Sequence, residues 1–138
     1  MDNLFPVKAA LRFTVHTYDI DAAGHVNNVV YIRWLEDLRN MIVESTFTFK
    51  HLLERNHYLV VISTEAKYRK QISLFDSPEG EMTLTGMKHG IFELHAKIIL
   101  NGKLSFSAVQ KCVLMNTRTG TMFTGKLNDF TIPKDIPL

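Results

Sequence analysis

The stretch Tyr18–Arg39, YDIDAAGHVNNVVYIRWLEDLR, places five polar side chains directly before the most strongly patterned helix of the chain. These side chains are Asp19, Asp21, His25, Asn27 and Asn28. Asp, Asn and Gly are ordinary residues of turns and helix caps, which accounts for part of the crowding. The junction also brings a carboxylate, an imidazole and the free N–H groups of a helix start into one short segment. It therefore has both a structural and a chemical interpretation.

From Val29 onward the pattern predicts one long amphipathic helix. Apolar residues recur at helical spacing, and polar residues occupy the opposite face. The apolar stripe is Tyr31, Trp34, Leu35, Leu38 and Ile42, and the polar face is Arg33, Asp37, Asn40 and Glu44. Asn27 or Asn28 is well placed as the N-cap residue. A short helix or irregular link is expected over residues 49–55.

The remainder of the chain has the pattern of β-strands separated by turns. The first strand is expected over Leu11–Val15, extending from Val7 to Tyr18. Asn101-Gly102 is the strongest hairpin signal and is typical of a two-residue type I′ turn, and His89-Gly90 predicts a second tight turn. Further strands are expected over residues 58–70, 81–88, 91–100 and 103–115.

These elements predict an α+β fold in a single domain over residues 1–138. A lone amphipathic helix cannot bury its apolar stripe by itself, so the antiparallel sheet has to curve around it. The second face of the sheet also needs cover, which a domain of this size often obtains by dimerisation.

Composition places the chain among ordinary globular proteins. Apolar residues make up 46% and charged residues 22% of the 138 residues, and the formal net charge is +2. No apolar run approaches the roughly 18 residues of a membrane span, the N-terminus lacks an export signal, and the mild charge does not indicate a nucleic-acid partner. Because Cys112 is the single cysteine, no internal disulfide or zinc site is indicated, and a reducing cytoplasm is the expected compartment.

The junction before the helix contains the parts of an acyl-transfer site. The first N–H groups of a helix, with the dipole behind them, stabilise negative charge, so a carbonyl oxygen held there is polarised. A carboxylate before the helix, such as Asp21, can attack that carbonyl or activate a water molecule. Turn formation remains an alternative for the same residues. A metal set of Asp19, Asp21 and His25 is a weaker one, because no further histidine or cysteine has a recognisable spacing.

The segment DIDAAGHVNNVVYIRWLEDLR resembles the signature of the hotdog-fold acyl thioesterases of the 4-hydroxybenzoyl-CoA thioesterase type. The shared pattern is Asp-x-Asp-x-x-Gly-His-Val-Asn-Asn, followed by Tyr, an aromatic residue, Glu and a later Arg. The HVNN part is also similar to plant acyl-ACP thioesterases, and AKYRKQISLFD looks like the family's central strand. The resemblance implies a hotdog fold, in which a curved antiparallel sheet wraps around one long central helix.

The resemblance also implies a role for each site residue. The family's catalytic carboxylate lies three residues before the glycine, which is Asp21 here, and its oxyanion donor is the backbone N–H of Asn28. The acyl-ACP branch adds a catalytic histidine, which corresponds to His25, but it has an asparagine where this chain has Ala23. That departure favours the simpler mechanism of carboxylate plus helix N-terminus. Glu36 matches the helix glutamate of the family and is expected to be structural.

A thioesterase also has to hold the carrier of its acyl group. Coenzyme A carries phosphates, so basic residues on or beside the predicted strands are candidates for binding it; these are Arg69, Lys70, Lys88 and Lys111. Tyr31 and Trp34 are candidates for lining the acyl pocket. In this family the acyl chain usually enters between two protomers, so a homodimer or homotetramer is expected.

The sequence therefore predicts a cytoplasmic acyl-CoA thioesterase with no metal, no organic cofactor, and neither nucleic acid nor membrane as a partner. Asp21 is the expected general base or nucleophile, and the sequence does not separate these two roles. An acyl-ACP thioesterase is the alternative enzyme, and a non-catalytic acyl-CoA binding protein on the same fold is the alternative of another class. The length or aromatic character of the acyl group is not encoded in any motif.

Overall fold

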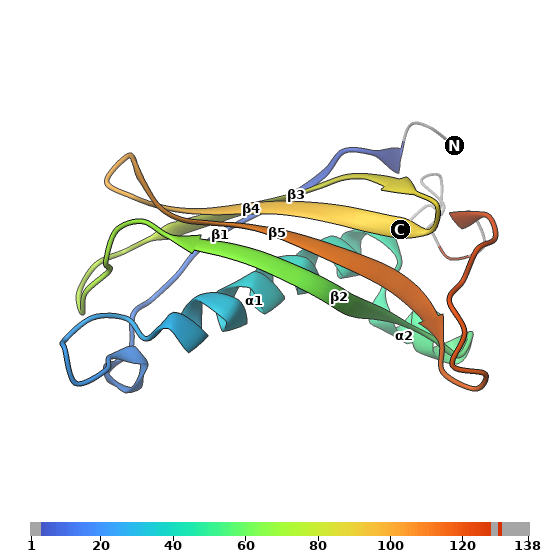
Figure 1. The fold of residues 1–138 in the computed structure, drawn as a ribbon, viewed down its shortest axis with the longest axis horizontal. Coiled ribbons are helices and arrows are strands. Elements are labelled where there is room, and N and C mark those ends of the chain that lie inside the picture. The colour runs from blue at the N-terminus through green and yellow to red at the C-terminus, as the bar shows by residue number, and fades with distance from the viewer. Residues whose placement is uncertain (1–3, 128–129, 131–138) are drawn as a thin grey trace, which may run out of the picture.

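The computed structural model describes residues 4–127 and 130. Figure 1 shows a curved sheet with one long helix lying along one of its faces. The elements in chain order are β1 (Val7–Arg12), the 3₁₀ turn η2 (Thr17–Asp19), α1 (Asn28–Thr46), α2 (Phe49–Glu54), β2 (His57–Tyr68), β3 (Glu79–Lys88), β4 (Ile91–Leu100) and β5 (Lys103–Asn116). The predicted α+β fold is confirmed.

The sheet has five strands in the order β1-β3-β4-β5-β2, and every neighbouring pair is antiparallel. Both predicted tight turns are confirmed, because the paired residues His89-Gly90 and Asn101-Gly102 all have the positive φ angles that a type I′ turn requires. The order leaves β1 and β2 as the two edges of the sheet. The helix α1 approaches β1 and β3 most closely, so it lies nearer one edge than the other.

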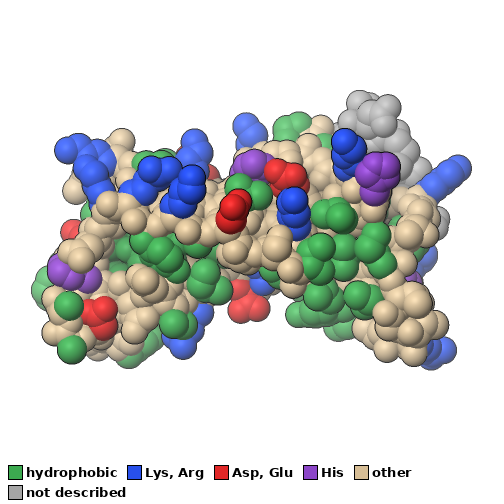
Figure 2. All heavy atoms as spheres, in the orientation of Figure 1, with side chains coloured by type: hydrophobic (Ala, Val, Ile, Leu, Met, Phe, Trp, Pro, Cys, Tyr) green, Lys and Arg blue, Asp and Glu red, His purple; other side chains and the backbone are tan. Residues whose placement is uncertain are grey.

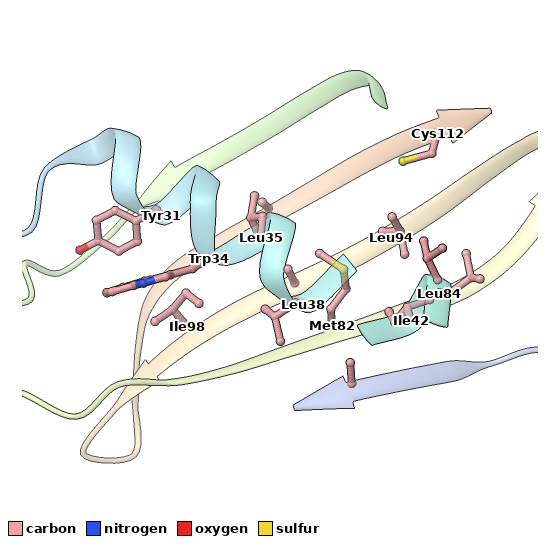
Figure 3. Close-up of a cluster of buried hydrophobic side chains, with 14 of the residues drawn as sticks. Tyr31, Trp34, Leu35, Leu38, Ile42, Met82, Leu84, Leu94, Ile98 and Cys112 are labelled. Carbon is pink, nitrogen blue, oxygen red and sulfur yellow. The ribbon is translucent and has the colours of Figure 1, made fainter. Parts of the chain in front are cut away.

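The core lies between α1 and the sheet, as Figure 3 shows. All five residues of the predicted apolar stripe are buried, and Leu35 and Leu38 are completely so. The sheet faces them with buried side chains of β3 and β4, namely Met82, Leu84, Leu94 and Ile98. The predicted polar face of α1 is exposed. Helical period and strand alternation therefore identified the core correctly.

Two predicted strand ends are wrong. The first strand stops at Arg12 instead of continuing to Val15 or Tyr18, because the Asp19 carboxylate accepts the N–H of His16 and folds Thr17–Asp19 into a 3₁₀ turn. β2 stops at Tyr68. The next two N–H groups, of residues 69 and 70, both donate to the carbonyl of Ser105, which takes the chain out of the strand ladder.

Candidate active site

The segment between η2 and α1 is held in place by backbone hydrogen bonds on both sides. Ile20 and Val26 form an antiparallel bridge, and the Val26 N–H donates to the Ile72 carbonyl at 2.8 Å. The Asp19 carbonyl accepts the Asn27 N–H at 2.9 Å. At the tip of this small hairpin, Gly24 has a φ of 86°, a conformation that glycine adopts without strain. The loop that carries Asp21 is thus fixed to both the helix start and the segment after β2.

Asp21 is an exposed residue whose carboxylate organises its own loop. Oδ1 accepts the N–H of Ala23 at 2.9 Å and that of His25 at 3.4 Å, as in an Asx turn. Among the described residues, no hydrogen bond engages Oδ2. A carboxylate offers two oxygens, so one can hold the loop while the other faces a substrate or a water molecule. The structural and chemical interpretations of this residue are therefore compatible.

The start of α1 presents a free backbone N–H next to this loop. Asn27 is the N-cap residue, as predicted for one of the two asparagines, and its Oδ1 accepts the N–H of Val29 at 3.0 Å. Asn28 is the first helical residue, and within the described part of the chain its N–H has no hydrogen-bond acceptor. The hydroxyl of Tyr68 donates to the Asn28 carbonyl at 3.2 Å and ties β2 to the helix start. This N–H is the kind of donor that stabilises an oxyanion.

His25 lies between Asp21 and Asn28 in the sequence and is half-buried. Its backbone bridges to Ser73, and its Nδ1 atom is buried with no hydrogen-bond partner among the described residues. No hydrogen bond at that buried nitrogen therefore fixes the tautomer of the ring among the described residues.

Aromatic rings form the apolar wall of the site. Tyr31 is buried and lies against Tyr68 and Phe106, with ring centroids 5.3 Å and 4.9 Å away. Burial raises the pKa of Tyr31, opposed by a hydrogen bond to the backbone of Ile72, and burial also raises the pKa of Tyr68. Both phenols are therefore neutral near neutral pH and serve as wall and hydrogen-bond donors.

These groups surround one cavity of about 530 Å³. Its lining is Asp21, Ala23, His25, Val26, Asn28, Tyr31, Tyr68, Arg69, Lys70 and Gln71. The structure thus brings together six residues predicted for the site: the three catalytic candidates, Tyr31 and the basic pair that follows β2. The loop and the helix start are contiguous in the sequence, whereas the end of β2 at Tyr68 lies 40 residues after Asn28.

Three other candidates lie elsewhere. Trp34 is buried against Phe13, with ring centroids 4.8 Å apart, and it lines a different hollow of about 410 Å³ beside η2. Lys88 and Lys111 are exposed residues of β3 and β5 and do not line the cavity. A contact between any of these three and a substrate stays a prediction.

Sequence reasoning did not predict four of the residues that line the cavity, Ala23, Val26, Tyr68 and Gln71. Tyr68 directly precedes the basic pair in the quoted segment AKYRKQISLFD, but no local pattern shows that β2 ends beside the start of α1. The signal for Tyr68 in the sequence is an aromatic residue followed directly by two basic residues. In the structure its side chain remains 44% exposed. Among residues 4–127 and 130, no three His, Cys, Asp or Glu side chains form a group that could hold a metal ion.

Comparison with known proteins identifies the family. Residues 15–137 match the model of the thioesterase-like superfamily. The chain belongs to this superfamily. Its class is accordingly that of a thioester hydrolase, as the resemblance in the junction implied. No protein with a curated description resembles this superfamily member closely enough in sequence to count as a match.

Solved structures of other proteins share the fold of this superfamily member. The probable thioesterase YbaW of Escherichia coli is 24% identical, with a TM-score of 0.80 over 88% of this chain and 94% of its own. SAV2348 of Staphylococcus aureus, solved in complex with CoA, is 16% identical, with a TM-score of 0.81 over 90% and 79%. A Thermus thermophilus thioesterase, complexed with coenzyme A and Zn, is 21% identical, with a TM-score of 0.76 over 88% and 95%. The predicted hotdog fold is confirmed. None of the described helices has the length and apolar character to cross a membrane.

Proposed function

We propose that the protein is an acyl-CoA thioesterase, which hydrolyses an acyl thioester to a free acid and a thiol. One observation carries this proposal: Asp21 lines the same cavity as Asn28, whose N–H has no acceptor among residues 4–127 and 130. A carboxylate and a helix N-terminus facing a common space can activate water and stabilise the resulting oxyanion. His25 and the basic pair Arg69 and Lys70 supply further polar groups of that space.

In the general-base route, Asp21 takes a proton from water while the water oxygen attacks the thioester carbonyl carbon. The oxyanion of the tetrahedral intermediate accepts a hydrogen bond from the Asn28 N–H. When the intermediate collapses, the carbon–sulfur bond breaks and the thiolate leaves. The proton on Asp21 or one on His25 then neutralises the thiolate. In the nucleophilic route, an Asp21 carboxylate oxygen attacks the carbonyl carbon, and the carbon–sulfur bond breaks as the thiolate leaves. Water then hydrolyses the mixed anhydride, which releases the acid and regenerates Asp21.

Coenzyme A is the proposed carrier because Arg69 and Lys70 line the cavity and further basic side chains lie at the same end of the molecule. Figure 2 shows Lys and Arg side chains gathered at the end of the molecule where β2 ends and the β4–β5 hairpin turns. The exposed basic residues of this region are Lys67, Arg69, Lys70 and Lys103. Cations of this kind bind phosphates. Two structural neighbours were solved with bound coenzyme A, which supports the same carrier here.

The proposed enzyme is a cytoplasmic homodimer or homotetramer. The edge strand β2 supports this assembly, because it exposes Tyr58, Ile62 and Tyr68 beside backbone groups that a second copy can pair with. Asp21 is exposed in one chain, so a second chain over this edge would also shield the site from water.

The test is thiol release from short, long and aromatic acyl-CoAs by the wild type and the Asp21→Asn variant. Loss of the carboxylate is expected to lower kcat by roughly 10²–10⁴-fold while CoA binding is retained. Asp37→Asn, which removes an exposed carboxylate from the far side of α1, is the matched control and should keep wild-type activity.

The same experiment separates the alternatives. Binding of acyl-CoA without thiol release by either protein would mean a non-catalytic binding protein. Faster release from acyl-ACP than from acyl-CoA would make the acyl carrier protein the true carrier. Equal activity in the wild type and Asp21→Asn would mean that another group, with His25 the first candidate, activates water.

A further inference from the structure

A second groove lies along the side of α1, next to the proposed active site. Residues Asn28, Ile32, Glu36 and Arg39 follow each other at helical spacing and form one stripe on α1. The groove has a volume of about 250 Å³. Its lining is Ile32, Arg33, Glu36, Arg39, Val61, Thr64 and Gln110. It begins one helical turn beyond Asn28, on the side of the helix that faces the edge strand β2.

Small side chains occupy the part of the sheet between the cavity and this side groove. On the inner face of β2 and β5, three cross-strand pairs succeed each other, namely Tyr68 with Phe106, Ala66 with Ala108, and Thr64 with Gln110. The first pair belongs to the aromatic wall of the active site. The alanine pair carries only methyl groups, and α1 approaches the other edge of the sheet more closely. The inner face of β2 and β5 therefore changes from apolar beside the active site to polar at Thr64 and Gln110.

The polar end is a linked set of three side chains. Arg39 Nη1 donates to Gln110 Oε1 at 2.9 Å, and Gln110 Nε2 donates to Thr64 Oγ1 at 3.1 Å. Gln110 is 3% exposed, and the Arg39 side chain is 15% exposed. These contacts hold the Arg39 guanidinium at the far end of the groove and keep most of the side chain out of solvent.

The charge of Arg39 is incompletely compensated. Its firm partner is a neutral amide, and the nearest carboxylate oxygen, on Glu36, lies 3.8 Å from Nη2 on a side chain that is 59% exposed. Burial raises the pKa of the nearby Cys112 thiol to about 11, so that group is neutral and supplies no negative charge. A largely buried guanidinium with five N–H donors is stabilised by an anion that it can bind through two of them.

We propose that the side groove holds the acyl chain of the substrate and that Arg39, supported by Gln110 and Thr64, binds a carboxylate at its distal end. The preferred substrates are then monothioesters of dicarboxylic acids. This inference rests on the proposed thioesterase function and names its substrate class. About 16 Å of helix axis separates Asn28 from Arg39. Because helical side chains lean toward the N-terminus, the guanidinium lies nearer the reacting carbonyl than that.

The test compares CoA thioesters of equal chain length with and without the distal carboxylate: adipoyl with hexanoyl, suberoyl with octanoyl, and sebacoyl with decanoyl. The wild type is expected to favour the carboxylated member of at least one pair by about tenfold or more in kcat/KM, the effect of one charge-assisted hydrogen-bonded pair. Arg39→Met should abolish that preference. Arg39→Lys, which keeps the charge without the planar fork, should retain part of it.

Arg118→Met is the matched control, because it removes an exposed arginine from a remote turn and should leave the preference unchanged. If Arg39→Met fails to fold, the graded response of Arg39→Lys decides the question. Equal kcat/KM values within every pair for the wild type would overturn the proposal. So would an Arg39→Met variant that keeps the preference but dissociates in light scattering, since Arg39 would then pair with a second copy.

A failure of the proposed function can be told apart from a failure of this inference. If no thioester is hydrolysed, binding of the thioether analogues octyl-CoA and carboxyheptyl-CoA is measured by calorimetry. Tighter binding of the carboxylated analogue, lost in Arg39→Met, supports the distal site in a protein that is not a thioesterase. Equal binding of the two analogues overturns the inference.

Discussion

At the scale of single residues, the junction before α1 combines folding and chemistry in the same side chains. Asp19 is buried, and its carboxylate and carbonyl hold both η2 and the N-cap residue Asn27. Asp21 shapes the loop with one oxygen and leaves the other available. Asn27 accepts the Val29 N–H, whereas the Asn28 N–H has no acceptor in the described part of the chain. The capping contact therefore leaves Asn28 as the proposed oxyanion donor.

Replacing Asn27 by Ala removes the cap and is expected to cost about 1 kcal/mol of the free energy of unfolding. The first turn of α1 should fray, so thioester hydrolysis should fall as well. Asn27→Asp, which also caps helices, should restore most of both. Urea denaturation and thiol release measure the two effects. Asn40→Ala on the exposed face of the same helix is the control, and an Asn27→Ala cost no larger than that of the control contradicts the capping role.

At the scale of elements, β3 passes so close to the core that one position has no room for a side chain. A Cβ at Gly80 would overlap the ring of Phe13 and would lie 3.1 Å from Leu38 and 3.2 Å from Ile98. Phe13 lies in the segment after β1, Leu38 in α1 and Ile98 in β4. Gly80 therefore sets how closely these three parts of the chain approach β3.

The Gly80→Ala substitution is accordingly expected to destabilise the protein by about 1–3 kcal/mol through overpacking. Gly86, on the same strand, has no atom within 4 Å of a built Cβ. Gly86→Ala should therefore be neutral or slightly stabilising, since it lowers the entropy of the unfolded chain. Urea midpoints of both variants make the comparison, and equal effects would show that strand entropy, not packing, governs Gly80.

The elements also show what could be predicted from the sequence. The stripe of α1 and the two tight turns were predicted because each depends on residues near one another in the chain. The end of β1 was missed because it depends on one carboxylate, that of Asp19, which alternation does not register. Tyr68 was missed in the site because its contact with Asn28 spans 40 residues and follows from the pairing of β2 with β5.

At the scale of the whole molecule, the core contains a titratable group that has to stay neutral. Cys112 is completely buried on the inner face of β5, and burial raises its pKa from 9.0 to about 11. In the folded protein the thiol keeps its proton over a pH range in which the unfolded chain has lost it. The stabilisation is thus fully present below about pH 9 and is lost as the pH rises toward 11.

Urea denaturation at several pH values from about 8 to about 11, a range that spans the two pKa values of this thiol, tests the linkage. The wild type is expected to lose up to about 1.4 kcal/mol per pH unit more than Cys112→Ala in this window. The variant is less stable at every pH because of its cavity, so the slopes are compared. Tyr31 and Tyr68 contribute to both slopes alike. Parallel slopes would mean that the thiol ionises freely in the folded state.

The two edge strands of the sheet differ in length, and this difference restricts how copies of the chain can pair edge to edge. β1 has 6 residues and β2 has 12, so pairing β2 of one copy with β1 of the next would leave half of the longer strand without partners. Pairing β2 with β2 satisfies more backbone groups and is related by a two-fold axis, which closes the contact after two chains. If copies assemble through β2 as proposed, the same edge therefore limits the pairing to two chains and works against open-ended fibres.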